Sequence, residues 1–236
     1  MQNFNSISVE NFIKTIYQFE LREGKDTRSG SIAKELGITN AAATDMARKL
    51  ASKNIVAYQK YKALKLTADG KKMALHIVRR HRLWETFLHQ VLGLNMHEIH
   101  QEAELLEHAT SEFLLDKIDA FLGNPTTDPH GDPIPNKNGV IEKEKEVLTL
   151  SAAKVGECYE VCRLVGGHKE FYDFCQANKL TVGAFISINK QYPHTKMTEI
   201  EIGSLRISLH ADLAGMIYLK KLKKSAEHIS STSKNG

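Results

Sequence analysis

Hydrophobic positions in the first 66 residues recur first at helical and then at alternating spacing. Residues 9–21 carry apolar side chains every three or four positions, which predicts an amphipathic helix. Two shorter helical patterns follow, separated by a turn at Gly37. Their candidate N-cap residues are Ser29 or Ser31 for the first and Thr39 or Asn40 for the second. This order predicts a helix-turn-helix.

Residues 55–66 alternate apolar with polar or cationic side chains around a short turn, which predicts a β-hairpin and completes a winged helix-turn-helix. Thr67 is a candidate N-cap for a long helix that ends near Leu92. After the break at Gly93, a second long helix is expected from about Met96 to Leu122. The apolar faces of these two helices exceed what one helical hairpin buries, which indicates a dimer interface.

The last third of the chain alternates short β-rich runs with glycine-bearing turns. The runs cover residues 157–165, 184–189, 197–202, 205–209 and 216–219, and they predict a small β-barrel. We therefore expect a mostly α-helical protein with a small C-terminal β-barrel. The expected divisions are a winged helix-turn-helix at 1–75, a helical domain at 76–141, a linker at 142–150, the barrel at 151–224 and a disordered tail at 225–236.

The chain has 236 residues, of which 42% are hydrophobic and 25% charged, and this composition is typical of a globular protein. It contains no apolar run of membrane-spanning length and no N-terminal signal sequence. We therefore expect a cytoplasmic protein without a membrane partner. The three cysteines, Cys158, Cys162 and Cys175, do not fit a disulfide framework, so reduced thiols are expected.

Charge is divided unevenly along the sequence. Residues 1–82 carry 16 Lys and Arg against 7 Asp and Glu, whereas residues 83–141 carry 2 against 10. The basic block indicates a polyanionic partner such as double-stranded DNA. Seven of the eleven histidines lie from His76 to His130, and imidazoles interleaved with carboxylates are ligands of divalent transition metals.

The helix-turn-helix suggests which residues contact DNA. The N-terminal end of a recognition helix reaches base edges in the major groove, and basic side chains around it contact phosphates. The candidate base-contacting residues are Thr39, Asn40, Ala42, Ala43 and Thr44, and the candidate phosphate-contacting residues are Arg28, Arg48, Lys60 and Lys62. Ala42 and Ala43 are equally compatible with close packing.

A metal-binding pattern lies in the acidic block. His100, Glu104, Glu107 and His108 are spaced so that they share one face of a helix, and His81 and Glu85 repeat the four-residue spacing on the preceding helix. The carboxylates repel one another unless a cation neutralises them, which predicts metal binding coupled to local ordering. The alternative is an exposed acidic helix with scattered histidines. Because no nucleophile, phosphate-binding loop or catalytic triad accompanies these residues, we expect no enzyme.

Three strings in this region resemble one protein family. They are RRHRLWETFL at 79–88, HQEAELLEH at 100–108 and PHGDPIP at 129–135. They closely resemble the diphtheria toxin repressor and manganese transport regulator family of bacterial metal-dependent repressors. The resemblance covers nearly the whole chain. It implies a homodimer with a winged helix-turn-helix, a helical dimerisation domain and a C-terminal domain similar to SH3 and ferrous-iron transport A domains.

The same resemblance implies two metal sites. By this likeness Glu104, Glu107 and His108 match the primary site, completed from the first helix at Asn11, where the family usually has Met or Asp. His81, Glu85 and His100 match the ancillary site. Further ancillary ligands are implied at Asp128 and His130, and at His168 or Glu170 of the C-terminal domain.

The residue at position 104 bears on which metal is bound. Glu104 stands where iron-responsive members carry Cys and manganese-responsive members carry Glu. Because hard oxygen ligands favour manganese over softer competitors, Mn²⁺ is the expected cofactor, with Fe²⁺ as the alternative.

The expected function is repression of metal-homeostasis genes. In this hypothesis metal binding fixes the first helix against the dimerisation helices and favours the DNA-competent state of the dimer. An iron-responsive repressor of the same family is the first alternative. A metal-dependent nucleic-acid hydrolase also needs a basic surface beside a carboxylate cage. A third possibility is a metal-independent DNA-binding module whose acidic helices bind a protein partner.

Overall fold

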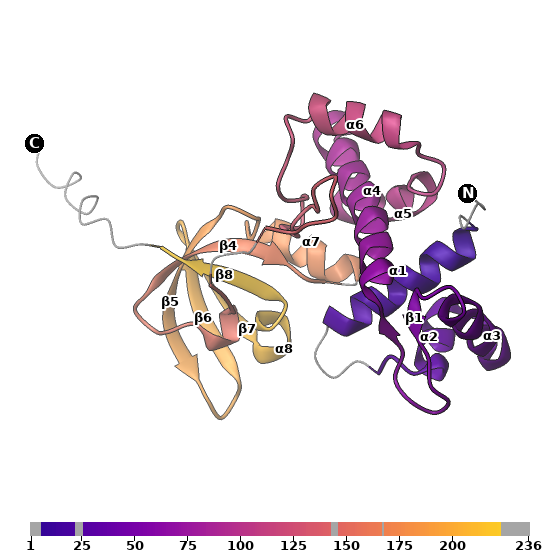
Figure 1. Cartoon of the computed structure of the whole chain (residues 1–236). Coiled ribbons are helices and arrows are strands. Elements are labelled where there is room, and N and C mark those ends of the chain that lie inside the picture. Colours follow the sequence, from indigo (N-terminus) through magenta and orange to yellow (C-terminus); the bar gives the residue numbers. More distant parts are fainter. Residues whose placement is uncertain (1–5, 22–25, 143–145, 167, 223–236) are drawn as a thin grey trace, which may run out of the picture. The chain divides into compact units, whose positions relative to one another are not determined.

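The computed structural model describes residues 6–21, 26–142, 146–166 and 168–222. It divides into two compact units, residues 1–142 and 143–236, and each is described by itself. The tail expected at 225–236 lies outside the described residues. The predicted fold class, with a helical N-terminal part and a β-rich C-terminal part, is confirmed (Figure 1).

The first unit begins with three helices and a short two-stranded sheet. These elements are α1 (Ile7–Leu21), α2 (Ser29–Leu36), α3 (Asn40–Ala51), β1 (Val56–Ala57) and β2 (Lys65–Leu66). The two strands pair antiparallel, with Val56 opposite Leu66, and form the predicted wing. Apolar side chains of all three helices and of the wing share one buried core that includes Phe12, Ile32 and Leu64. The winged helix-turn-helix is therefore confirmed.

Helix capping in this region differs in one detail from the prediction. The Thr39 side chain accepts a hydrogen bond from the Ala42 amide and caps α3 as expected. The N-cap residue of α2, however, is Arg28, which makes no side-chain capping bond. The predicted caps Ser29 and Ser31 are wrong, because Ser29 already lies inside the helix and the Ser31 hydroxyl donates to Asp26.

The remaining helices of the first unit are α4 (Ala68–Leu92), α5 (Met96–Leu106) and α6 (Glu112–Phe121). In Figure 1, α4 crosses the whole unit, with the winged helix at one end and α5 and α6 at the other. The single helix expected from Met96 to Leu122 is wrong. Ser111 accepts a hydrogen bond from the Leu114 amide and starts a new helix, and the Trp84 indole donates to Thr110 in the break.

The second unit is built on one antiparallel sheet in the order β3-β8-β4-β5-β6-β7. Its strands are β3 (Val147–Thr149), β4 (Cys158–Leu164), β5 (Phe185–Tyr192), β6 (Met197–Ile202), β7 (Leu205–His210) and β8 (Ile217–Lys221). In β6 every second side chain is buried, as the sequence alternation predicts.

Short helices complete the second unit. They are η1 (Leu150–Ala152), α7 (Lys169–Ala177) and α8 (Ala211–Ala214). The sequence reasoning missed α7, and it placed a linker at 142–150 where the structure has β3 and the start of η1. The three cysteines lie in this unit, and none of them forms a disulfide within the part of the chain that the structure describes.

Gly70 at the start of α4 gives a test of how the wing packs on this helix. A Cβ atom at Gly70 would lie 2.1 Å from the Ile55 carbonyl oxygen, so Gly70→Ala must displace backbone. We expect this change to lower the free energy of unfolding by about 1–3 kcal/mol in chemical denaturation, the usual cost of overpacking. Gly30→Ala in α2 is the matched control, because its Cβ would meet only the Asn40 side chain at 3.6 Å. Equal stability of the two variants would contradict this packing.

Candidate metal centre

Side chains from three helices converge in the middle of the first unit. Helix α1 contributes Glu10 and Lys14, and α4 contributes His81 and Glu85. Helix α5 and the residues that follow it supply the remaining members of the cluster, which are His100, Glu104, Glu107 and His108. Every primary and ancillary residue predicted on the two helices therefore belongs to one polar cluster, in which all members are buried or half-buried except His100, which is exposed.

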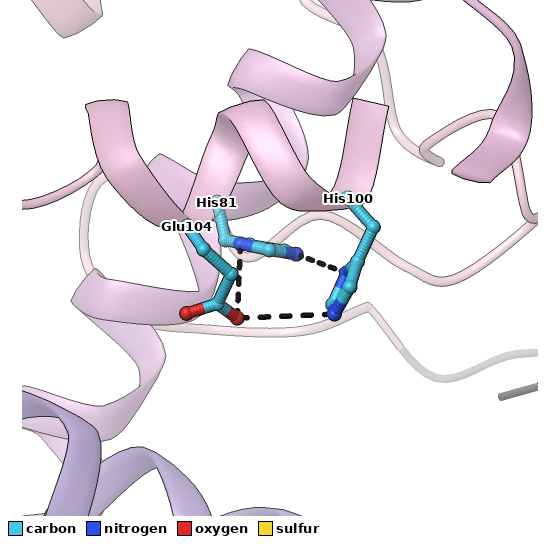
Figure 2. Close-up of side chains that lie close together, drawn as sticks. All are labelled: His81, His100 and Glu104. Carbon is cyan, nitrogen blue, oxygen red and sulfur yellow. Dashed lines mark hydrogen bonds and ion pairs between the residues drawn. The ribbon is translucent and has the colours of Figure 1, made fainter. Parts of the chain in front are cut away.

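The first potential ligand group consists of His81, His100 and Glu104, which point toward one another in Figure 2. The His81 Nε2 atom lies 3.2 Å from His100 Nδ1, and His81 Nδ1 lies 3.8 Å from Glu104 Oε1. One ligand atom from each residue lies within 4.8 Å of the others. These distances between ligand atoms suit coordination of one ion at metal–ligand bond lengths of about 2.0–2.2 Å.

Glu85 stands behind this first group. Its Oε1 lies 3.0 Å from His81 Nε2 and 3.2 Å from His100 Nδ1. The Glu85 side chain is almost fully buried. The predicted ancillary residues His81, Glu85 and His100 therefore contact one another directly, and Glu104, predicted for the primary site, reaches the same group.

The second potential ligand group consists of Glu104, Glu107 and His108. The His108 Nδ1 atom lies 2.6 Å from Glu10 Oε2, a contact that suits Nδ1–H donating to the carboxylate. His108 Nε2 is buried and has no hydrogen-bond partner among the described residues. A carboxylate that holds one ring nitrogen and leaves the other as a lone-pair donor is the usual arrangement behind metal-binding histidines. The residues present therefore fit a divalent cation.

An ammonium group already lies among these carboxylates. Lys14 Nζ donates to Glu104 Oε1 at 2.6 Å and to Glu107 Oε1 at 2.9 Å. It also lies 3.3 Å from His81 Nδ1. The Lys14 side chain is only 5% exposed, and that of Glu107 is fully buried. Lys14 thus contacts residues of both ligand groups.

Two further predicted residues, Asp128 and His130, reach the cluster from the loop after α6. Both are buried, and His130 Nε2 lies 3.6 Å from Glu85 Oε1. The Asp128 carboxylate accepts hydrogen bonds from the His130 and Asp132 amides and so shapes this loop. His130 therefore lies beside the ancillary group, while Asp128 stabilises the loop through its hydrogen bonds to backbone amides.

Asn11 and His168 stay predictions as ligands. Asn11 lies on α1 between Glu10 and Lys14, and its side-chain oxygen is buried with no hydrogen-bond partner among the described residues. His168 lies in the second unit, at the N-cap position of α7.

Burial and ion pairing act against each other on the titratable groups of the cluster. Burial alone would lower the pKa of His81, but the carboxylates of Glu85 and Glu107 outweigh it and raise that pKa to about 9. Burial would raise the pKa of Glu85, but His81 and hydrogen bonds from His100 and His130 hold it well below its usual value. In the metal-free cluster, His81 and Glu85 therefore form an imidazolium–carboxylate pair at neutral pH.

Asp128 is an exception in this cluster. Burial and the nearby charges of Glu85 and Asp132 raise the pKa of Asp128 to about 7. This carboxyl group is therefore partly protonated at neutral pH.

The predicted DNA-contacting residues gather around the N-terminal end of α3 and the wing. Thr39, Asn40 and Ala42 are exposed, and Thr44 is half-buried with its hydroxyl donating to the Asn40 carbonyl. Ala43 is fully buried in the winged-helix core, so its predicted base contact is wrong and it serves the close packing of α3.

The four predicted phosphate-contacting residues share one pocket. Arg28, Arg48, Lys60 and Lys62 line it together with Ser29, Ser31 and Thr44. The pocket lies between the start of α2, the middle of α3 and the wing. Four cationic side chains around hydroxyl groups suit a DNA phosphate.

Sequence reasoning missed the roles of Glu10 and Lys14. A signal was present, because both interrupt the apolar pattern of α1 four residues apart and therefore point to the same side of the helix. Arg80 was also missed; its guanidinium donates to Glu10 at 2.8 Å and holds the carboxylate that faces His108. Charged side chains within an apolar stripe indicate a buried partner.

Comparisons with known proteins define the class of this fold and site. The domain family described as "Iron dependent repressor, N-terminal DNA binding domain" matches residues 6–64. The family described as "Iron dependent repressor, metal binding and dimerisation domain" matches residues 67–136. No helix among the described residues is long and apolar enough to cross a membrane.

Individual relatives agree with this class. The chain is 34% identical over 128 residues to the iron-dependent repressor IdeR of Mycobacterium leprae, a match that covers 54% of this chain and 55% of that protein. The chain thus spans about half the length of the curated relatives it matches.

Solved structures match over more of the chain. It resembles a manganese-dependent transcriptional repressor in complex with manganese, with a TM-score of 0.82 and 30% identity over 91% of this chain and 100% of that one. It also resembles ScaR with bound Cd²⁺, with a TM-score of 0.75 and 30% identity over 91% of this chain and 99% of that one. The chain belongs to the iron-dependent repressor family, which includes the diphtheria toxin repressor.

The raised pKa of His81 predicts how the stability of the metal-free protein depends on pH. Because this pKa is about 9 in the folded chain and about 6.5 in the unfolded chain, the ion pairs of His81 stabilise the fold fully below pH 6.5. This contribution, up to about 3 kcal/mol, is lost as the pH rises from 6.5 to 9. We expect urea denaturation in the presence of a chelator to show that decline, and His81→Gln to flatten it. If the free energy of unfolding fell equally with pH in wild type and variant, His81 would not be the group responsible.

Proposed function

We propose that this protein is a metal-dependent, DNA-binding transcriptional repressor of metal-homeostasis genes. One observation carries the proposal. Glu10 and Lys14 of α1, a helix of the winged-helix core, contact Glu104, Glu107 and His108 at the end of α5. A cation bound among these residues therefore acts directly on a helix that packs against the DNA-binding elements.

The primary site in this proposal is formed by Glu104, Glu107 and His108. Glu10 orients His108, and His81, Glu85, His100 and His130 form the neighbouring site. The bound cation supplies positive charge that neutralises the carboxylates. Asn11, with its buried side-chain oxygen, is a further candidate ligand from α1.

Manganese is the proposed cofactor, with iron as the alternative. The ligands are carboxylate oxygens and imidazole nitrogens, and the first unit contains no cysteine in its sequence. Thiolates favour softer metals, whereas oxygen-rich sites suit Mn²⁺. The similar repressor bound to manganese supports this choice, and the iron-dependent relatives support the alternative.

The proposed DNA partner lies against the exposed start of α3 and the basic pocket beside it. Thr39, Asn40 and Ala42 face the bases, and Arg28, Arg48, Lys60 and Lys62 hold a backbone phosphate in their shared pocket. A symmetric dimer presents two such surfaces, so the preferred site is an inverted repeat with half-sites about one duplex turn apart. The metal favours that dimer by binding its DNA-competent state more tightly.

Parallel selections from a random duplex library test the metal dependence. We expect the protein with Mn²⁺ to enrich an inverted-repeat motif, and the protein with chelator to enrich none. Glu107→Gln, which removes a fully buried carboxylate, is expected to weaken Mn²⁺ binding in calorimetry at least about tenfold and to abolish the enrichment.

Glu102→Gln is the matched control, since Glu102 is an exposed glutamate on α5, the helix that ends just before Glu107. It is expected to behave as wild type in both assays. The proposal is wrong if the same motif is enriched equally with Mn²⁺ and with chelator. Cleavage of the duplex in the Mn²⁺ reactions would favour a nuclease instead.

Exposed apolar side chains on α5 and α6 supply the proposed dimer contact. Leu105 is 71% exposed and Phe113 is 74% exposed, and the matching family includes dimerisation in its description. We expect Phe113→Asp to shift the protein from dimer to monomer in sedimentation velocity. Phe185→Asp, at a 63% exposed phenylalanine of the second unit, is expected to stay dimeric. A dimeric Phe113→Asp protein would rule out this contact.

A further inference from the structure

Lys14 is a buried charged residue that a metal site of carboxylates does not require. Its ammonium group lies 2.6 Å from Glu104 Oε1 and 2.9 and 3.0 Å from the two Glu107 oxygens. These are the carboxylates that belong to the second potential ligand group. An ammonium in this position uses the lone pairs that a metal ion would need.

The charge balance explains why the lysine lies there. Glu104 and Glu107 face the same small volume, and two carboxylates held together repel each other strongly away from water. Lys14 supplies one positive charge between them and donates a hydrogen bond to each. The metal-free cluster thereby avoids a buried unpaired charge, whose cost is large.

A divalent ion and this ammonium cannot occupy the cluster together. A metal–oxygen bond is about 2.0–2.2 Å long, whereas Lys14 Nζ contacts the same oxygens at 2.6–3.0 Å, so the two cations would lie within contact distance. Their mutual repulsion at that separation is severe in a buried site. Lys14 also lies 3.3 Å from His81 Nδ1 and is therefore displaced by an ion in either ligand group.

We propose that Lys14 is an internal counter-cation that competes with the divalent metal and sets the metal concentration at which the site fills. This inference rests on the proposed function. It assigns to Lys14 a role in setting the affinity for the metal, because a single positive charge between Glu104 and Glu107 is exchanged for a double one. The exchange also removes the ion pair between Lys14 and Glu104, which links α1 to α5 in the metal-free protein.

Calorimetric titration with Mn²⁺ tests the competition. Lys14→Met keeps the length of the side chain and removes its charge, so we expect it to bind Mn²⁺ at least about tenfold more tightly than wild type. Lys14→Arg keeps the charge and is expected to bind no more tightly than wild type. Lys71→Met, at an exposed lysine of α4, is the control and should leave the affinity unchanged.

Thermal melting gives a second readout that does not depend on DNA. Without metal, Lys14→Met is expected to melt at a lower temperature than wild type, because Glu104 and Glu107 lose their counter-cation. The increase in melting temperature on adding Mn²⁺ should then be larger in this variant. If the methionine variant does not fold, Lys14→Gln takes its place, since its amide still donates a hydrogen bond without carrying charge.

The outcomes separate this inference from the proposed function. Equal or weaker Mn²⁺ binding by the uncharged variants, in a series where wild type binds Mn²⁺ and Glu107→Gln does not, overturns the role of Lys14 alone. Failure of both wild type and the uncharged variants to bind Mn²⁺ overturns the metal-dependent function and this inference with it.

Discussion

The buried charge cluster between α1 and the end of α5 is the interaction on which the candidate site depends. Glu107 is fully buried, so its charge must be balanced inside the protein, and Lys14 and His81 provide the balance. The charge of Glu10 is balanced in the same way by Arg80, and the Glu10 carboxylate also contacts His108 Nδ1 at 2.6 Å. Burying any one of these charged groups without its partners would cost free energy. The packing of α1 against α4 and α5 and the geometry of the site therefore depend on each other.

Helix α1 connects the two halves of the first unit because it is buried on two sides. Phe12, Ile13 and Ile16 belong to the winged-helix core, which also contains side chains of α2 and α3. Glu10 and Lys14 belong to the polar cluster. A change in the charge of the cluster therefore alters the contacts of α1. This helix shares its buried core with α3, the recognition helix. In the proposed function, this arrangement is the physical route by which a cation in the cluster affects the DNA-binding elements of the first unit.

Much of the fold and of the candidate site could be predicted from the sequence. The order of a helix-turn-helix, a wing and a long helix follows from hydrophobic spacing and from the capping residues Thr39 and Thr67, because these signals act within a few residues. A spacing of four residues also places His81 with Glu85, and His100 with Glu104, on common helix faces. Local errors arose where two signals competed, as at Ser111, whose capping hydrogen bond starts a second helix within an apolar pattern that predicts a single one.

Most of the elements, the candidate ligand chemistry and the family likeness can be predicted from the sequence, since each depends on neighbours along the chain. Which side chains meet across long separations depends on how the elements pack. Lys14 and Glu107 are 93 positions apart, and His108 and Glu10 are 98 apart. No periodicity relates such positions. In the same way, Ala43 is buried while Ala42 is exposed. A run of three alanines does not indicate which of them faces the core.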